Sequence, residues 1–136
     1  MPGSSFDTEV LLDAVSPDPA RAQRAETLIA AGGTISVQVL NEFANVASRQ
    51  MLASWSDTRT MPTSLRGLLS VRPLTTDVHD NRLAIAERCG RAVYDAMIAA
   101  FGLDAGCDTS WSEDLQDGMV PNDRLRVTNP SAAHHR

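Results

Sequence analysis

The stretch "TISVQVLNEFANVASRQM", residues 34–51, combines the two patterns that decide the fold class. Its first three residues, "TIS", are predicted to form a short strand. From residue 37 onward, apolar side chains recur at helical spacing and define one apolar face, which consists of Val39, Leu40, Phe43, Val46 and Ala47. A strand that runs directly into an amphipathic helix indicates a β–α unit.

Similar signals lie on both sides of this unit. Before it, Asp18 and Pro19 are typical of an N-cap followed by proline at the first helical position, and Gly32-Gly33 ends the helix predicted over residues 20–31. After it, residues 54–69 are predicted to be a polar connection that passes into helix, and residues 70–74 a short strand. Thr76 is predicted to cap a helix over residues 77–89 that Gly90 terminates.

The C-terminal third continues the alternation. Residues 92–105 form the most apolar predicted helix, which Gly106 closes. Residues 108–111 and 125–130 are predicted strands, with a turn over residues 112–118 between them. Short strands that alternate with helices of about ten or more residues predict parallel strands joined by helical crossovers, and therefore an α/β sandwich.

Composition narrows the possible functions. The 136 residues suit one domain, and the 43% hydrophobic content predicts a folded chain. The net charge of −5 argues against a protein that binds nucleic acid mainly by electrostatics. All 12 basic residues are arginine, so mechanisms that need a lysine, such as Walker-type phosphate loops and Schiff bases, are excluded.

The N-terminus and the cysteines point to a cytoplasmic protein. No basic region followed by a long apolar region marks a signal peptide, and no apolar run approaches the length of a membrane span. The two cysteines, Cys89 and Cys107, are expected to be buried thiols rather than a disulfide.

Four carboxylates stand where the predicted elements could bring them together. Asp7 follows the first apolar run and Asp114 follows the strand "DTSW", so both are expected at the carboxyl ends of strands, where α/β sheets place their functional cleft. Glu42 and Asp95 lie in apolar helices. Each acid alone has an ordinary explanation, as a solvated position or a helix-start aspartate.

As a set, converging carboxylates would repel each other unless a cation lay among them. Oxygen ligands favour Mg²⁺ or Mn²⁺ over zinc. The chain has no cysteine and histidine constellation that would suit zinc, because His79 is the one histidine outside the C-terminal tail. Carboxylate-held Mg²⁺ is usual for phosphoester chemistry.

The order and surroundings of these acids resemble those of PIN-domain ribonucleases, and more closely the VapC-type toxins of type II toxin–antitoxin systems. The matching segments are "FDTEVLLDAVS" (6–16), "GGTISVQVLNEFANVASR" (32–49), "VYDAMIAAFGLDAGCDTSWSEDLQDG" (93–118) and "LRVTNP" (125–130). The resemblance implies a PIN-like three-layer α/β/α sandwich with a short, mainly parallel central sheet. It also implies one nuclease domain over residues 1–130 and a flexible tail over residues 131–136.

The resemblance further implies which residues carry the chemistry. The expected catalytic residues, which also bind one or two Mg²⁺ or Mn²⁺ ions, are Asp7, Glu42, Asp95 and Asp114. Ser112 matches a small hydroxyl residue that supports the last acid. Asp117 falls where some relatives carry a further acid, although a solvated turn residue explains it equally well. The arginines that flank the acid-bearing helices are candidates for RNA binding, or else ordinary helix-end cations: Arg49, Arg88 and Arg91.

A member of this family would cleave within RNA and leave a 5′-phosphate and a 3′-hydroxyl. The resemblance implies a cognate antitoxin protein that neutralises the enzyme, a homodimer, and no membrane partner. The chain departs from the family at Glu9, Asp13 and Ala92. These changes leave open a catalytically inactive PIN domain that acts as a protein-binding module. A phosphatase of the haloacid dehalogenase type is a weaker alternative, because Glu9 replaces the second aspartate of its signature.

Overall fold

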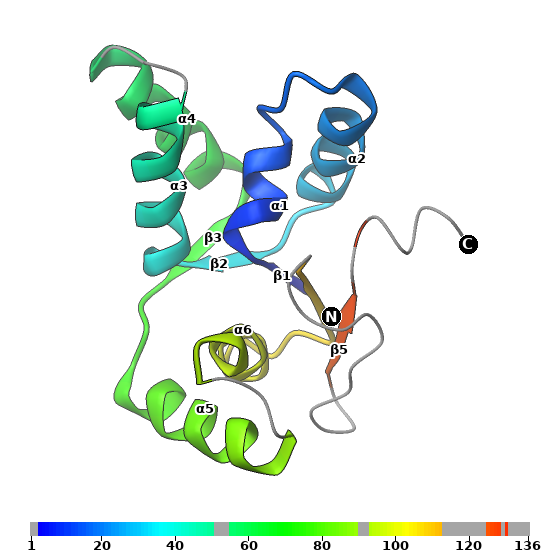
Figure 1. Ribbon diagram of the computed structural model, residues 1–136, viewed down its shortest axis with the longest axis vertical. Coiled ribbons are helices and arrows are strands. Elements are labelled where there is room, and N and C mark those ends of the chain that lie inside the picture. Colours follow the sequence, from blue (N-terminus) through cyan, green and yellow to red (C-terminus); the bar gives the residue numbers. More distant parts are fainter. Residues whose placement is uncertain (1–2, 51–54, 90–92, 113–124, 129, 131–136) are drawn as a thin grey trace.

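In the part of the chain that the structure describes, five short parallel strands form one central sheet (Figure 1). They are β1 (Ser4–Phe6), β2 (Thr34–Ser36), β3 (Ser70–Arg72), β4 (Thr109–Trp111) and β5 (Arg126–Thr128). The order across the sheet is β3-β2-β1-β4-β5, and every pair of neighbours is parallel. The sheet therefore grows outward from its centre in two directions, and the order reverses between β1 and β4.

A computed structural model describes residues 3–50, 55–89, 93–112, 125–128 and 130. For a few helical residues within these ranges, Asp95 among them, the description covers the backbone and not the side chain. The predicted turn over residues 112–118 lies, apart from Ser112, outside the described residues, as do Gly90 and the tail over residues 131–136.

Helices cover both faces of the sheet, which confirms the predicted three-layer arrangement (Figure 1). One group consists of α1 (Thr8–Asp13), α2 (Pro19–Ala30), α3 (Val37–Gln50) and α4 (Trp55–Leu68). The other face carries α5 (Thr76–Cys89) and α6 (Val93–Asp104). Each face has its own buried core: Phe6, Leu11, Ile35 and Phe43 belong to the first, and Val78, Ile85, Phe101 and Leu125 to the second.

Most of the predicted helix ends are confirmed. Asp18 caps α2, because its side chain accepts a hydrogen bond of 3.1 Å from the Ala20 N–H. Gly32 and Gly106 adopt φ values of +89° and +74° just after α2 and α6, a conformation that glycine reaches without a steric penalty. The predicted cap of α5 is wrong by one residue. Thr75, rather than Thr76, accepts from the Val78 N–H at 3.2 Å, so the helix begins at Thr76.

The segment before β3 is more helical than its polar composition predicts. Helix α4 begins at Trp55 and continues through Pro62, although proline lacks the N–H that a helix interior uses. Thr60 and Thr63 lie on either side of the proline, and their hydroxyls donate to the carbonyl oxygens of Ser56 and Arg59, both at 2.8 Å. These hydroxyls add hydrogen bonds to the turns on either side of the proline, but they do not replace its missing N–H, which would have bonded the carbonyl of Thr58.

Two further predictions from the sequence concern membrane spans and the cysteines. No helix among the described residues is long and apolar enough to cross a membrane. Cys107 is a free, buried thiol, and burial raises its pKa above the ordinary value of a cysteine, with the neighbouring Asp108 acting in the same direction. The thiol is therefore protonated at neutral pH, as the sequence predicts for a buried structural cysteine.

Candidate active site at the switch point of the sheet

Asp7 and Ser112 meet where the strand order reverses. Phe6 pairs with Trp111 at the ends of β1 and β4, and the Asp7 N–H donates to the Trp111 carbonyl oxygen at 2.9 Å. Ser112, which directly follows Trp111, donates from its hydroxyl to Oδ2 of Asp7 at 3.1 Å. In open α/β sheets this switch point, at the carboxyl ends of the strands, is where ligands bind.

The carboxylate of Asp7 has a second fixed contact. Asp7 is the N-cap of α1, and its Oδ1 accepts from the Thr8 N–H at 2.7 Å. The side chain is 4% exposed, so both oxygens are held in place inside the protein rather than moving in solvent. Partners that donate to a buried carboxylate reduce the cost of its desolvation, and the start of a helix favours its negative charge.

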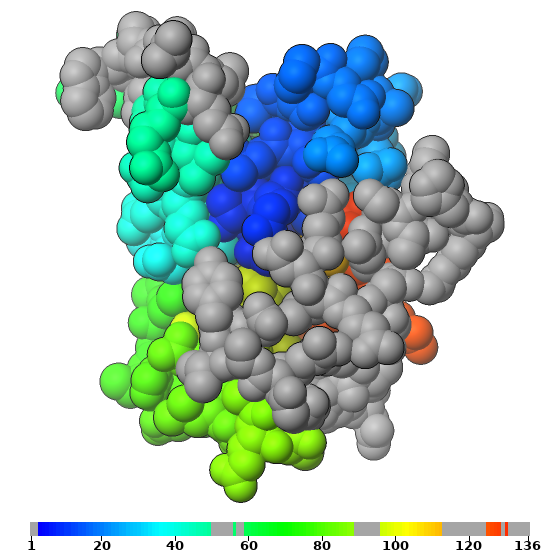
Figure 2. Space-filling view, viewed as in Figure 1, coloured from blue at the N-terminus to red at the C-terminus, as the bar shows by residue number. Residues whose placement is uncertain are grey.

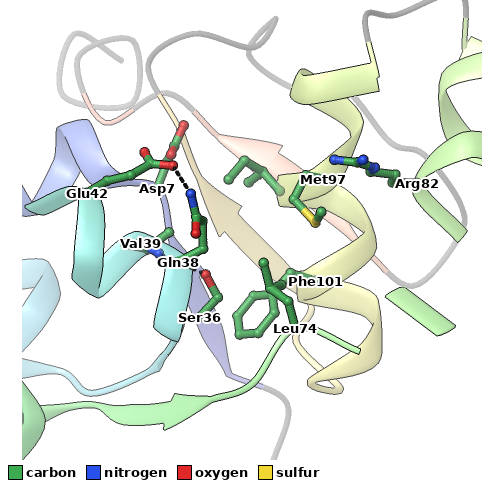
Figure 3. Close-up of a pocket in the computed structure, with 10 residues that line it drawn as sticks. Asp7, Ser36, Gln38, Val39, Glu42, Leu74, Arg82, Met97 and Phe101 are labelled. Carbon is green, nitrogen blue, oxygen red and sulfur yellow. Dashed lines mark hydrogen bonds between the residues drawn. The ribbon is translucent and has the colours of Figure 1, made fainter. Parts of the chain in front are cut away.

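Thr8 links Asp7 to the second acid of the site. Its hydroxyl donates to Oε2 of Glu42 at 3.0 Å, while its backbone N–H contacts Asp7. The other oxygen of Glu42 accepts from Nε2 of Gln38 at 3.1 Å, one helical turn earlier on α3 (Figure 3). One threonine therefore orients two carboxylates that are separated by 35 positions in the sequence.

Both acids line a cavity of about 350 Å³ between α3 and the α5–α6 pair. Figure 3 shows the carboxylates on one side and an apolar wall opposite them. Ser36, whose Oγ accepts from the Val39 N–H at 3.0 Å, lies at the start of α3 on the acid side. The apolar lining consists of Val39, Leu74, Met97, Ile98 and Phe101.

The remaining predicted acids are only partly described. Asp95 belongs to the first turn of α6, and Met97 and Ile98 of the same helix line the cavity with Asp7 and Glu42. Its side chain lies outside the described part, as do Asp114 and Asp117 entirely. Among the described residues, no cluster of three or more Asp, Glu, His or Cys side chains could hold a metal. The metal-binding role of the four acids stays a prediction.

Two of the three arginines that the sequence singles out do not line the cavity. Arg49 and Arg88 lie exposed in the last turns of α3 and α5, and neither is among the cavity-lining residues, while Arg91 lies outside the described residues. Arg82 of α5 does line the cavity. A sequence signal for it exists, because Arg82 falls at helical spacing from the buried residues Val78 and Ile85.

Asp13, one of the departures from the family pattern, has a local partner. It is 7% exposed and lies at the far end of α1 from Asp7. Its Oδ1 is 3.7 Å from Nη1 of Arg21, beside a second cavity of about 320 Å³. Neither Asp13 nor Glu9 lines the cavity that contains Asp7 and Glu42. Arg21 therefore offsets the charge that Asp13 adds to this part of the chain.

The described donor set fits a hard divalent cation. Asp7 and Glu42 both line one cavity with their carboxylate oxygens, and a carboxylate oxygen can accept more than one bond. Oxygen-only donors of this kind suit Mg²⁺ or Mn²⁺, whereas the lining residues that the structure describes include no cysteine or histidine that would favour zinc.

The family model of the PIN domain matches residues 5–115, which is most of the chain and includes both described acids. The chain belongs to the PIN-domain family. The predicted family and fold are thereby confirmed. A comparison with curated proteins gives no significant match.

Solved structures of PIN-domain toxins share this fold. A toxin–antitoxin complex from Klebsiella pneumoniae superposes with a TM-score of 0.71 at 17% identity, covering 94% of this chain and 98% of that one. DNA-bound VapBC from Salmonella typhimurium gives 0.67 at 19% identity, covering 96% and 99%. VapC20 of Mycobacterium tuberculosis, a toxin that cleaves the sarcin–ricin loop, gives 0.62 at 18% identity, covering 79% and 87%.

The hydroxyl of Thr8 provides a test of how the two acids are oriented. We expect Thr8→Val to lower metal affinity and cleavage rate roughly 10-fold, because outer contacts of metal ligands typically contribute ~10- to 100-fold. Valine keeps the backbone N–H that donates to Asp7, but it lacks the hydroxyl that donates to Glu42. Thr8→Ser retains the hydroxyl, and Thr27→Val removes a hydroxyl that bonds Gln23 on α2, so both should behave as wild type. Equal activity of Thr8→Val and Thr8→Ser would show that the link to Glu42 has no role.

Proposed function

We propose that this chain is a Mg²⁺-dependent endoribonuclease toxin, which hydrolyses RNA phosphodiester bonds and is neutralised by a cognate antitoxin. The observation that carries the proposal is the pair of carboxylates, Asp7 and Glu42, which Thr8 holds in one cavity at the switch point of a PIN-domain sheet. PIN domains are generally nucleases and usually use a divalent metal ion.

Asp7 and Glu42, together with Asp95 and Asp114, are the residues proposed to hold the ion. A bound Mg²⁺ or Mn²⁺ would polarise a phosphoryl oxygen and lower the pKa of a bound water, which supplies the nucleophile for hydrolysis. Mn²⁺ would serve the same donor set, because its ligand preference is also for oxygen.

The chain's own residues contribute orientation. Thr8 and Ser112 fix the two oxygens of Asp7, and Thr8 and Gln38 fix those of Glu42. Carboxylates that are already oriented need not reorganise when the substrate arrives, which is the main source of electrostatic catalysis. In the proposed reaction, the oxygen of water forms a bond to phosphorus, the bond to the 3′-oxygen breaks, and that oxygen takes up a proton. The products are a 5′-phosphate and a 3′-hydroxyl.

The proposed antitoxin follows from the structures that share the fold. The Klebsiella structure is a toxin–antitoxin complex, and the Salmonella and Rickettsia felis structures are VapBC assemblies with DNA. We extend this association to the present chain as a proposal, together with the homodimer that the family resemblance implies. Sedimentation of the purified chain, alone and with its antitoxin, measures both assemblies.

Cleavage of single-stranded RNA by the purified chain tests the enzymatic proposal. We expect cleavage with Mg²⁺ or Mn²⁺, none after chelation with EDTA, and recovery when the metal is restored in excess. The fragments should carry 5′-phosphates, which a 5′-phosphate-dependent exonuclease detects. A chain that binds no divalent metal and cuts no RNA, but still binds an antitoxin, would contradict the proposal and favour the inactive protein-binding module.

A further inference from the structure

The positively charged side chain of Arg82 lies on the apolar side of the cavity. It lies on the face of α5 that also buries Val78 and Ile85, whereas the adjacent Leu83 is 44% exposed. Figure 3 shows its side chain extending from α5 toward Met97 of α6. Arginine at such a position costs free energy relative to a solvent-facing one, so its place in the cavity calls for an explanation.

The Nε of Arg82 is buried without a hydrogen-bond partner among the described residues. Two ion pairs between described residues involve other arginines: Arg21 pairs with Asp13, and Arg72 pairs with Asp104. A buried donor without an acceptor is unfavourable, so a water, an ion or a ligand that supplies an acceptor to Arg82 would stabilise this arrangement. The cavity is the space from which such an acceptor could reach the guanidinium group.

The wall around Arg82 is apolar. Leu74, Met97 and Phe101 line the cavity between Arg82 and the acid side (Figure 3). Its volume of about 350 Å³ falls within the range of ~300–1,000 Å³ that is usual for sites that enclose a small organic group. A ligand that fits must therefore combine a flat or compact apolar body with acceptor atoms at one edge, and it must extend toward the carboxylates at the other end.

On the basis of the proposed ribonuclease function, we infer that this cavity holds one unstacked base of the RNA strand beside the scissile phosphate, with Arg82 donating to acceptor atoms on the base edge. Single-stranded RNA is recognised in this way, by bases that leave the stack and enter side-chain pockets. A phosphate is the poorer occupant, because its full charge would lose hydration against the apolar wall.

The donor geometry of Arg82 selects among bases. A guanidinium group presents only donors, in a planar fork that matches two adjacent acceptors. Guanine offers this pair, O6 and N7, on one edge, whereas adenine places an amino donor next to N7. Cytosine also has two adjacent acceptors, O2 and N3, but it is the smaller base and would fill less of the cavity. The cavity is therefore expected to prefer guanine at one position next to the cleaved bond.

Two readouts test this subsite, and only one of them depends on cleavage. In the first, the methyl signal of Met97 is followed by NMR during titration with each of the four nucleoside 5′-monophosphates and with inorganic phosphate. We expect the guanine nucleotide to shift this signal at the lowest concentration, and Arg82→Gln to weaken that binding roughly 10- to 100-fold, since a bidentate base contact is worth this much discrimination. Arg82→Lys, which keeps the charge and loses the fork, should lose the preference as well.

The second readout is the base preference of cleavage on a randomised RNA pool. Arg82→Gln should flatten the preference at one position, because it lowers the cleavage rate of the preferred substrates more than that of the others. Arg66→Gln, which removes an exposed arginine of α4 outside the cavity, is the matched charge control. Thermal denaturation of each variant verifies that the fold is retained.

The possible failures are distinct. If RNA is cut but the preference and the Met97 shift are unchanged in Arg82→Gln, the subsite is wrong and the nuclease stands. If no RNA is cut but guanine nucleotide binding depends on Arg82, the subsite stands and the nuclease fails. Inorganic phosphate that shifts Met97 as strongly as the guanine nucleotide would overturn the base assignment. Loss of antitoxin binding in Arg82→Gln without any nucleotide effect would overturn it in favour of a protein contact.

Discussion

Asp7→Asn is expected to lower the rate of metal-dependent RNA cleavage by about 1,000-fold or more without unfolding the protein. The substitution removes one of the two described carboxylates from the cavity, and charge stabilisation by a catalytic metal is worth several kcal/mol, where ~1.4 kcal/mol corresponds to tenfold in rate. Asparagine caps helices as well as aspartate does, so the start of α1 should persist. Initial cleavage rates at saturating Mg²⁺, with Mn²⁺ affinity measured by calorimetry, provide the test.

Asp18→Asn is the matched control for this variant. Asp18 also caps a helix, α2, through a hydrogen bond to a backbone N–H, but it is exposed and lies outside the cavity. The two variants therefore make the same chemical change in the same local structure. We expect Asp18→Asn to cleave RNA at the wild-type rate. Similar rates for Asp7→Asn and Asp18→Asn, with equal melting temperatures, would rule out Asp7 as a metal ligand.

Gly102→Ala is expected to destabilise the fold by about 2 kcal/mol, although alanine is the better helix former. Gly102 lies in α6 where the helix approaches the sheet, and a Cβ atom there would collide with the Ser110 hydroxyl and lie 3.1 Å from that of Ser5. These hydroxyls, 2.7 Å apart, are 0% and 1% exposed, so they have little room to move. Overpacking costs ~1–3 kcal/mol and a broken buried hydrogen bond a further ~1–3, against a gain of ~1 from helix propensity.

Activity should fall with stability in this variant, because α6 also carries Asp95 and the lining residues Met97 and Ile98. Urea denaturation followed by circular dichroism measures the free energy of unfolding. Gly67→Ala is the control, since Gly67 lies in the last turn of α4 with nothing within 4 Å of its added Cβ, and it should be neutral or stabilising by up to ~1 kcal/mol. Adding Ser110→Ala to Gly102→Ala should restore part of the loss. Equal stabilities for Gly102→Ala and Gly67→Ala would show that α6 does not touch the sheet closely.

Local signals in the sequence predicted the elements well. The N-cap at Asp18 and the glycines that end helices at Gly32 and Gly106 act within a few residues. Their effect on the structure can therefore be predicted from the adjacent sequence alone. The prediction for α5 missed by one residue because Thr75 and Thr76 are chemically equivalent caps, which the sequence alone does not distinguish; in the structure Thr75 accepts from the Val78 N–H. Helix α4 begins in a segment that the sequence predicts as a polar connection, and it continues through Pro62. Its threonine hydroxyls add hydrogen bonds that helix propensities do not count.

The sequence predicted which acids belong to the candidate site, but it did not predict the contacts between them. Asp7 and Glu42 stood out as acids in apolar surroundings, and the structure places both in one cavity. Thr8 did not stand out, because a threonine after an aspartate is common and its bond to Glu42 depends on how α1 lies beside α3. Figure 2 shows these helices, blue and cyan, side by side on one face of the molecule. Ser112 was expected to support the last acid and is found donating to Asp7, because β4 happens to neighbour β1.

By itself, therefore, the sequence determined the α/β class, several helix ends, such as the start of α2 and the ends of α2 and α6, and the acids that a cation would need. Periodicity and capping are local, so each follows from fewer than about ten neighbouring residues. Only the tertiary structure decided that β1 and β4 are adjacent, that Thr8 joins two distant carboxylates, that α6 touches the sheet at Gly102, and that Arg82 faces the cavity. These contacts depend on which helical crossover packs on which face of the sheet. That arrangement is set by the burial of two separate cores, to which residues from distant parts of the chain contribute.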